Sequence, residues 1–142
     1  MTLLALRAGR LGLELAPQAG GSIVRFTADG AIDLLRTTPP HAVASGRGND
    51  TACYPLVPFS GRIADGRFAF DGVEVALQPN WPGVRHAMHG DGWARSWAVT
   101  RSDDRSADIA YEHDGRTGWP FRYRARQSYR LDGDTLAIGM SI

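Results

Sequence analysis

The chain of 142 residues contains no lysine and only one cysteine. Because all 16 Lys+Arg positions are arginine, a lysine Schiff base and a lysine general base are excluded. Cys53 has no partner for an intrachain disulfide, so we expect a reducing, cytoplasmic location. The N-terminal apolar run is short and is broken by Arg7 and Arg10, which predicts no signal peptide. No run reaches the ~18 apolar residues of a membrane span, and we expect no membrane partner.

The formal net charge of +1 provides no bulk attraction to nucleic acid, so we expect no nucleic-acid partner. Hydrophobic residues make up 43% of the chain and are spread along its length, which is typical of a folded protein rather than a disordered one. The length fits one globular unit, and residues 1–142 are interpreted as a single domain.

Short apolar or alternating runs, separated by Gly, Asp, Asn and Pro, predict an all-β protein. The expected strands cover residues 3–7, 11–15, 22–27, 31–35, 67–70, 73–77, 96–101, 107–113, 121–131 and 135–142. No segment combines helical periodicity with caps, so no helix is predicted. Residues 37–51, rich in Pro, Gly, Ser and Asn, are predicted to form an irregular connection.

Two hairpins are predicted from turn residues. Asp71-Gly72 separates two strand-like runs, which is a strong hairpin signal. Residues 121–131 alternate large or apolar side chains with Arg and Gln for most of their length, as in an antiparallel strand with one buried face. Asp132-Gly-Asp then turns this run into residues 135–142.

The last predicted strand has no closing turn and no polar tail. A bare apolar edge strand promotes aggregation. We therefore expect the domain to be truncated at its C-terminus or completed by a partner. A homodimer formed through exposed sheet edges is the predicted arrangement.

Three sequence blocks follow one another in a recognisable order. They read Gly20-Gly-Ser-Ile-Val-Arg-Phe with Asp33-Leu-Leu-Arg, then Tyr54-Pro-Leu-Val-Pro-Phe-Ser-Gly-Arg-Ile-Ala-Asp-Gly-Arg-Phe, then His86-Ala-Met-His-Gly-Asp-Gly-Trp-Ala-Arg-Ser-Trp. A weaker fourth block is Gly118-Trp-Pro-Phe-Arg-Tyr-Arg-Ala. In order and spacing these blocks resemble the N-terminal half of the aldose 1-epimerase (galactose mutarotase-like) family.

The resemblance implies an antiparallel twisted β-sandwich, the galactose mutarotase-like supersandwich, of which this chain would hold about half. It also implies an isomerase that interconverts the α and β anomers of a hexose by acid–base ring opening, without a cofactor. In that family the acid is a His and the base a Glu from the later half of the pattern, and neither motif is present here. His113, in Tyr-Glu-His-Asp-Gly, is expected at a turn and is assigned no role.

The resemblance places Arg62 and His89 in the sugar cleft as supporting catalytic and substrate-binding residues. An arginine offers five donors and stays charged, and a histidine can donate or accept, so both suit sugar hydroxyls. The substrate would be a hexose or a hexose phosphate, with Arg62 or Arg85 as a phosphate partner. Gly61 stands where many family members have Asn, which implies one sugar contact fewer.

Further candidates for substrate binding are His86, Asp91 and Trp93. An indole offers a flat apolar face to the C–H side of a pyranose ring. Each candidate has a structural alternative. Arg62 and His89 could be an ordinary surface arginine and a hydrogen-bonded structural histidine, Asp91 a turn residue and Trp93 a core residue.

A zinc site at His86 and His89 lacks further ligands at a recognisable spacing, so no metal is expected. No carboxylate pair stands in a glycosidase-like setting, which excludes sugar-bond hydrolysis by that mechanism. A non-catalytic carbohydrate-binding module, or an inactive truncated product, is the alternative to an isomerase.

Overall fold

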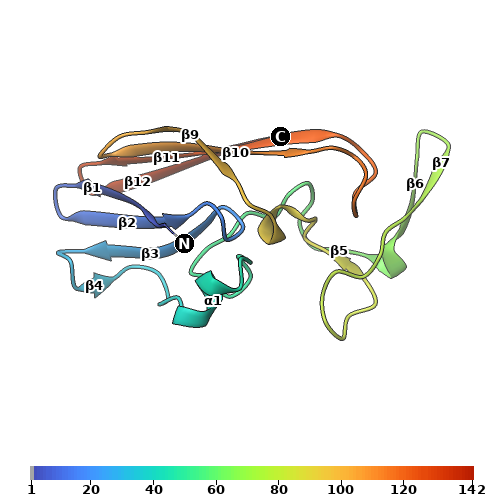
Figure 1. Cartoon of the computed structure of the whole chain (residues 1–142), viewed down its shortest axis with the longest axis horizontal. Coiled ribbons are helices and arrows are strands. Elements are labelled where there is room, and N and C mark those ends of the chain that lie inside the picture. Colours follow the sequence, from blue (N-terminus) through green and yellow to red (C-terminus); the bar gives the residue numbers. More distant parts are fainter. Residues whose placement is uncertain (1) are drawn as a thin grey trace.

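The computed structural model describes residues 2–142. Its strands form two four-stranded antiparallel sheets; in Figure 1 the sheet from the end of the chain lies above the sheet from its beginning. The first sheet has the order β1-β2-β3-β4, with bounds Leu4–Ala8, Leu11–Ala16, Ser22–Ala28 and Ile32–Asp33. The second has the order β12-β11-β10-β9, with bounds Thr135–Ser141, Tyr123–Asp132, Ser106–His113 and Ala98–Ser102. The predicted all-β antiparallel sandwich is confirmed.

The main core lies between these two layers. Leu6, Leu13 and Ile23 of the first sheet pack in one cluster with Ile109 and Leu131 of the second. Burying apolar side chains from both inner faces is the dominant favourable term for such a sandwich, at about 25 cal/mol per Å². The strand alternation that the sequence shows therefore has a direct structural cause.

Between β4 and β9 the chain leaves the sandwich and forms shorter elements (Figure 1). They are helix α1 (Pro40–Ala44), strands β5 (Arg62–Ile63), β6 (Arg67–Phe70), β7 (Val73–Ala76) and β8 (Ala87–Met88), and 3₁₀ turns at Ala64–Gly66 and Gly92–Ala94. Strand β5 pairs with β8, and β6 pairs with β7. A second apolar cluster, which includes Val75, Leu77 and Ala87, packs with Phe59 and Trp119 beside these strands.

Every predicted strand run overlaps an observed strand, and both hairpins are confirmed. Phe70 pairs with Val73 across the Asp71-Gly72 turn, where both turn residues have positive φ. Asp132 pairs with Thr135 at the second turn.

Three details were predicted wrongly or missed. Helix α1 lies inside the expected irregular segment; a single turn started by Pro40 is too short to show helical periodicity. The two-residue strands β5 and β8 are also too short to leave a pattern. Gln127 lies on the inner face of β11 and is 3% exposed, because its amide donates to Gly21 O and accepts from Tyr129 Oη.

Candidate functional site

The β5–β8 ladder brings Arg62 and His89 together. Arg62 pairs with Met88, and His89 follows directly in the chain. The His89 backbone N–H donates to the Gly61 carbonyl at 3.0 Å, while the Gly61 N–H donates to His89 Nδ1 at 3.0 Å. The two residues predicted from separate sequence blocks therefore lie on adjacent segments of one ladder.

The His89 ring is held in one tautomer. Since Nδ1 accepts the Gly61 N–H, the neutral ring carries its proton on Nε2. Burial and the neighbouring Arg62 cation lower the pKa of His89, because both disfavour a charged ring. His89 also has φ 57, which is a left-handed backbone conformation. Non-glycine residues adopt it rarely, and those that do are often found at functional sites. It is thus a neutral ring with an N–H donor at Nε2.

Arg62 is exposed, and within residues 2–142 its guanidinium takes part in no ion pair. A guanidinium without a protein counter-ion retains all five donors for a ligand or for water. The pair Arg62–His89 therefore offers a fixed cation and a directed N–H donor side by side.

His86 is bound to a different turn. Its Nδ1 accepts the backbone N–H of Asp65 at 3.0 Å. The Asp65 carboxylate forms an ion pair with Arg85 at 2.9 Å and lies 3.8 Å from His86. His86 and Arg85 consequently hold the turn that follows Arg62, and neither ring nitrogen of His86 is bonded to His89.

Trp93 is almost entirely covered. Its side chain is 1% exposed, its Nε1 donates to Gly90 O at 3.1 Å, and the Trp81 ring centre lies 5.3 Å away. The Arg47 guanidinium lies 5.4 Å from its ring centre. Trp93 therefore forms a wall rather than an open stacking face, which favours the structural alternative for this residue. Trp97, four residues further on, is 2% exposed and belongs to the main core cluster.

Asp91 accepts hydrogen bonds through both carboxylate oxygens. Tyr123 Oη donates to Oδ1 at 2.5 Å, while Tyr111 Oη and Arg95 Nε donate to Oδ2 at 2.9 and 3.3 Å. His113 Nδ1 also lies 3.1 Å from Oδ2. Burial and the Asp91 carboxylate raise the pKa values of both tyrosines, so these hydroxyls remain protonated donors.

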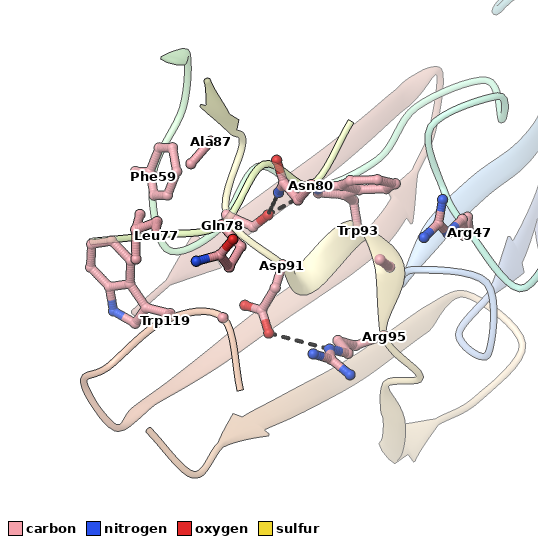
Figure 2. A pocket seen from close by; sticks show the side chains of 13 residues that line it. Arg47, Phe59, Leu77, Gln78, Asn80, Ala87, Asp91, Trp93, Arg95 and Trp119 are labelled. Carbon is pink, nitrogen blue, oxygen red and sulfur yellow. Dashed lines mark hydrogen bonds and ion pairs between the residues drawn. The ribbon is translucent and has the colours of Figure 1, made fainter. Parts of the chain in front are cut away.

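A cavity of about 270 Å³ opens next to this carboxylate. Figure 2 shows Phe59, Leu77 and Trp119 on one side of it, and Asp91 with Arg95 on another. Gln78, Asn80, Ala87, Trp93 and Arg47 also border it. Neither Arg62 nor His89 is among its lining residues, although Gly90 and Asp91, which follow His89, are. The cavity and the predicted arginine–histidine pair are thus neighbouring but separate features.

A sequence model of one family, described as aldose 1-epimerase, matches residues 3–142. The chain belongs to the aldose 1-epimerase family. YphB of Escherichia coli (strain K12), described as uncharacterized, is 39% identical over 142 residues, which is 100% of this chain and 46% of YphB. The aldose 1-epimerase of the same strain is 36% identical over 80 residues, or 54% of this chain and 22% of that protein.

Solved structures of this family share the fold. A crystal structure from Escherichia coli K12, provisionally described as an aldose 1-epimerase, superposes with a TM-score of 0.86 at 38% identity, covering 98% of this chain and 45% of that one. The GalM/aldose epimerase homologue from C. elegans has a TM-score of 0.76 at 18% identity over 92% and 42% of the two chains, which shows the fold alone. This aldose 1-epimerase family chain spans less than half the length of each of these relatives.

Sequence reasoning missed the Asp91-centred cluster. The predicted strand 107–113 correctly ends at His113, which is the last residue of β10, but its burial was missed: it is 5% exposed and stacks on Tyr123 at 5.1 Å and 18°. The spacing of Tyr111 and His113, two apart on a strand, places both on one face, and His113 pairs with Tyr123 in register. That alternation is visible in the sequence, but the loop that brings Asp91 to it is not.

No group of three or more His, Cys, Asp or Glu side chains suited to a metal ion occurs in the described part of the chain. Helices within residues 2–142 all fall short of the length and apolar character needed to cross a bilayer.

Proposed function

We propose that this chain contributes a sugar-binding site in which Arg62 and His89 hydrogen-bond the oxygens of a hexose or hexose phosphate. The supporting observation is the bond from Gly61 N–H to His89 Nδ1, which leaves Nε2–H as a directed donor beside a permanent cation. The reaction proposed is that of aldose 1-epimerases, the interconversion of α and β anomers through ring opening.

Ring opening requires one group to remove the proton of the anomeric hydroxyl and another to protonate the ring oxygen. Neutral His89 has no free nitrogen lone pair, because Nδ1 is occupied and Nε2 carries the proton. Arg62 remains charged near neutral pH. The pair therefore binds and polarises the sugar, and a further group must act as the base. The family resemblance implies a Glu as that base and a second His as the acid.

The second candidate function is carbohydrate binding without catalysis. For Arg62 and His89 taken alone, the protonation states favour binding without catalysis, since neither side chain can accept a proton from the substrate. In both functions the same two side chains contact the sugar.

The two functions are separated by measuring α/β exchange of glucose, galactose and their 6-phosphates with NMR saturation transfer, together with binding by titration. We expect Arg62→Ala and His89→Ala each to weaken binding about tenfold, the loss of one hydrogen bond to a charged or fixed donor. Arg101→Ala and His41→Ala, both exposed and on other elements, are the matched controls. Exchange faster than in buffer supports the isomerase. Exchange at the buffer rate with binding retained supports the binding module, and unchanged binding in both variants contradicts the site.

The proposal extends to a cytoplasmic role in hexose metabolism, supported by the lack of cysteine pairs. It also includes self-association, because β12 pairs with β11 on one side and forms an edge of its sheet.

A further inference from the structure

The hydrogen-bond partners of His113 determine which of its ring nitrogens carry protons. Its Nε2 lies 2.7 Å from the carbonyl oxygen of Trp119. A carbonyl oxygen can only accept, so Nε2 must carry a proton. The remaining question is whether Nδ1 carries a second one.

His113 Nδ1 and two oxygen atoms form a tight triangle. His113 Nδ1 lies 3.1 Å from Tyr111 Oη and 3.1 Å from Asp91 Oδ2, and Tyr111 Oη lies 2.9 Å from the same Oδ2. Tyr111 has one hydroxyl proton and so can satisfy one of its two neighbours. Without a proton on Nδ1, lone pairs of the imidazole and of the carboxylate would face each other at 3.1 Å. A second ring proton removes this conflict and leaves every contact of the triangle attractive.

The surroundings suit a buried ion pair. The side chains of His113 and Asp91 are 2% and 14% exposed. An ion pair at such depth is tolerated when additional hydrogen bonds satisfy the carboxylate, and Tyr111, Tyr123 and Arg95 supply them.

The other charged groups near His113 lie on β10, on β11, in the turn after β10 and just after the 3₁₀ turn at Gly92–Ala94. On β10, Glu112 is directed to Arg124 of β11 at 3.3 Å. Asp114 follows His113 and caps its own turn through Arg116 N. Arg95 opposes a positive ring, but its own bond to Asp91 is the longer one, at 3.3 Å. Asp91 is therefore the carboxylate that neutralises His113.

Asp91 connects this pair to the proposed sugar site. It lies two residues after His89, and its backbone N–H donates to Val57 O at 3.0 Å, as does the Gly92 N–H at 3.2 Å. The segment from His89 to Gly92 is thus held on one side by residues 57–61 and on the other by the end of β10 and β11. His113 also bonds the backbone of another lining residue of the cavity, through Trp119 O (Figure 2 shows Trp119 to one side of Asp91).

We propose that His113 is doubly protonated and forms a buried ion pair with Asp91, and that these two positioning residues fix the segment that carries His89. Asp91 then positions His89 through the backbone segment that joins them and does not itself contact the sugar. Only the last step, the effect on sugar binding, rests on the proposed function.

The first test reads the ring protons directly. Imidazole ¹⁵N shifts of the four histidines are followed from pH 5.5 to 8.5 in the wild-type chain, with His113 assigned from His113→Gln. We expect both His113 nitrogens to show the shifts of protonated nitrogens at pH 7.5, because Nε2 donates to Trp119 O and Nδ1 faces the Asp91 carboxylate. A His113 ring with one unprotonated nitrogen at pH 7.5 overturns the ion pair.

The second test measures, in the absence of sugar, whether Asp91 affects the position of His89. Asp91→Asn keeps the shape and removes the charge, so His113 should lose its Nδ1 proton by pH 7.5, and the His89 ring and Gly61 amide resonances should move. Asp114→Asn, next to His113 in the chain but exposed, is the matched control and should leave all of them in place. If Asp91→Asn does not fold, Tyr111→Phe, which removes one donor to Asp91, should shift the same resonances. Unmoved His89 and Gly61 signals in the folded variants overturn the positioning role.

The third readout is sugar affinity, which Asp91→Asn should lower roughly tenfold or more, since small misplacements of a binding group are costly. If no sugar binds the wild-type chain, the proposed function fails while the first two tests still decide the ion pair. If sugar binds wild type and Asp91→Asn equally, the positioning inference fails alone.

Discussion

The Nδ1 atom of His89 lies 3.0 Å from the backbone nitrogen of Gly61 and accepts its hydrogen bond. This contact crosses between two sequence blocks and joins the residue before Arg62 to the imidazole. A protonated His89 would place a second N–H against the Gly61 N–H, so the contact favours the neutral ring in addition to burial and Arg62.

Removing the charge of Arg62 should raise the pKa of His89 toward its ordinary value of 6.5, because the Arg62 cation is one cause of its lowering. The measurement is an NMR pH titration of the His89 ring in wild type and Arg62→Ala, with Arg101→Ala as a control that should change nothing. Sugar binding should stay constant above neutral pH and weaken only in acid, when His89 gains its proton. A His89 pKa that is the same in wild type and in Arg62→Ala would show that the two side chains do not interact.

The same lowered pKa predicts the sign of a stability change. On acidification the unfolded chain binds the His89 proton first, because its pKa is the ordinary one. His89 should therefore reduce the free energy of unfolding as the pH falls through about 6.5, and the loss should end below its folded-state pKa. Urea unfolding of wild type and His89→Ala across this range checks it, since the variant should lack this part of the pH dependence.

Gly90 allows the close approach of two backbones behind His89. A Cβ there would lie 2.0 Å from Val57 O, and the residue has φ +63. Gly46, with φ +71 and open space within 4 Å of where a Cβ would stand, is the matched control. We expect Gly46→Ala to cost about 1–2 kcal/mol for the left-handed backbone, and Gly90→Ala to cost a further ~1–3 kcal/mol from overpacking. Equal denaturation midpoints for both variants would contradict the tight contact.

Gln127 is a buried polar group that joins β11 to the turn before β3. Its Nε2 donates to Gly21 O at 2.9 Å, and its Oε1 accepts from Tyr129 Oη at 2.7 Å. Gln127→Met should lower the free energy of unfolding by about 1–3 kcal/mol, since Gly21 O loses its amide donor and the Tyr129 hydroxyl keeps only its longer bond, to Gly21 O at 3.3 Å. Gln18→Met, at an exposed position, should stay within about 0.5 kcal/mol. A stability of Gln127→Met equal to that of the control would show that the bridge contributes nothing.

Self-association through β12 is a prediction for sedimentation equilibrium. Ile138 and Met140 on this strand are about half exposed, and an apolar edge strand is prone to pair with another chain. We expect a dimer at micromolar concentration that Ile138→Glu dissociates, whereas Val73→Glu, a comparably exposed apolar site on the β6–β7 hairpin, leaves it intact. A monomeric wild-type chain at that concentration would exclude the dimer.

Most strands and hairpins could be predicted from local sequence patterns. The Asp71-Gly72 turn and the alternation along β11 depend on backbone geometry and on side-chain direction over a few residues, and both are found as predicted. Gln127 is the exception along β11, because the hydrogen bonds that permit its burial come from Gly21 and Tyr129, one of them more than a hundred positions away in the chain.

The residue types on their own established a lysine-free, disulfide-free β chain, and the ordered blocks around Arg62 and His89 indicated its family. Tertiary structure alone decided that Trp93 is a covered wall and that Asp91 meets Tyr111, His113 and Tyr123. The physical reason is the distance along the chain over which the determining interactions act. Strand periodicity is set by neighbours along the chain, whereas burial and ion pairing depend on which distant segment a loop places against a side chain.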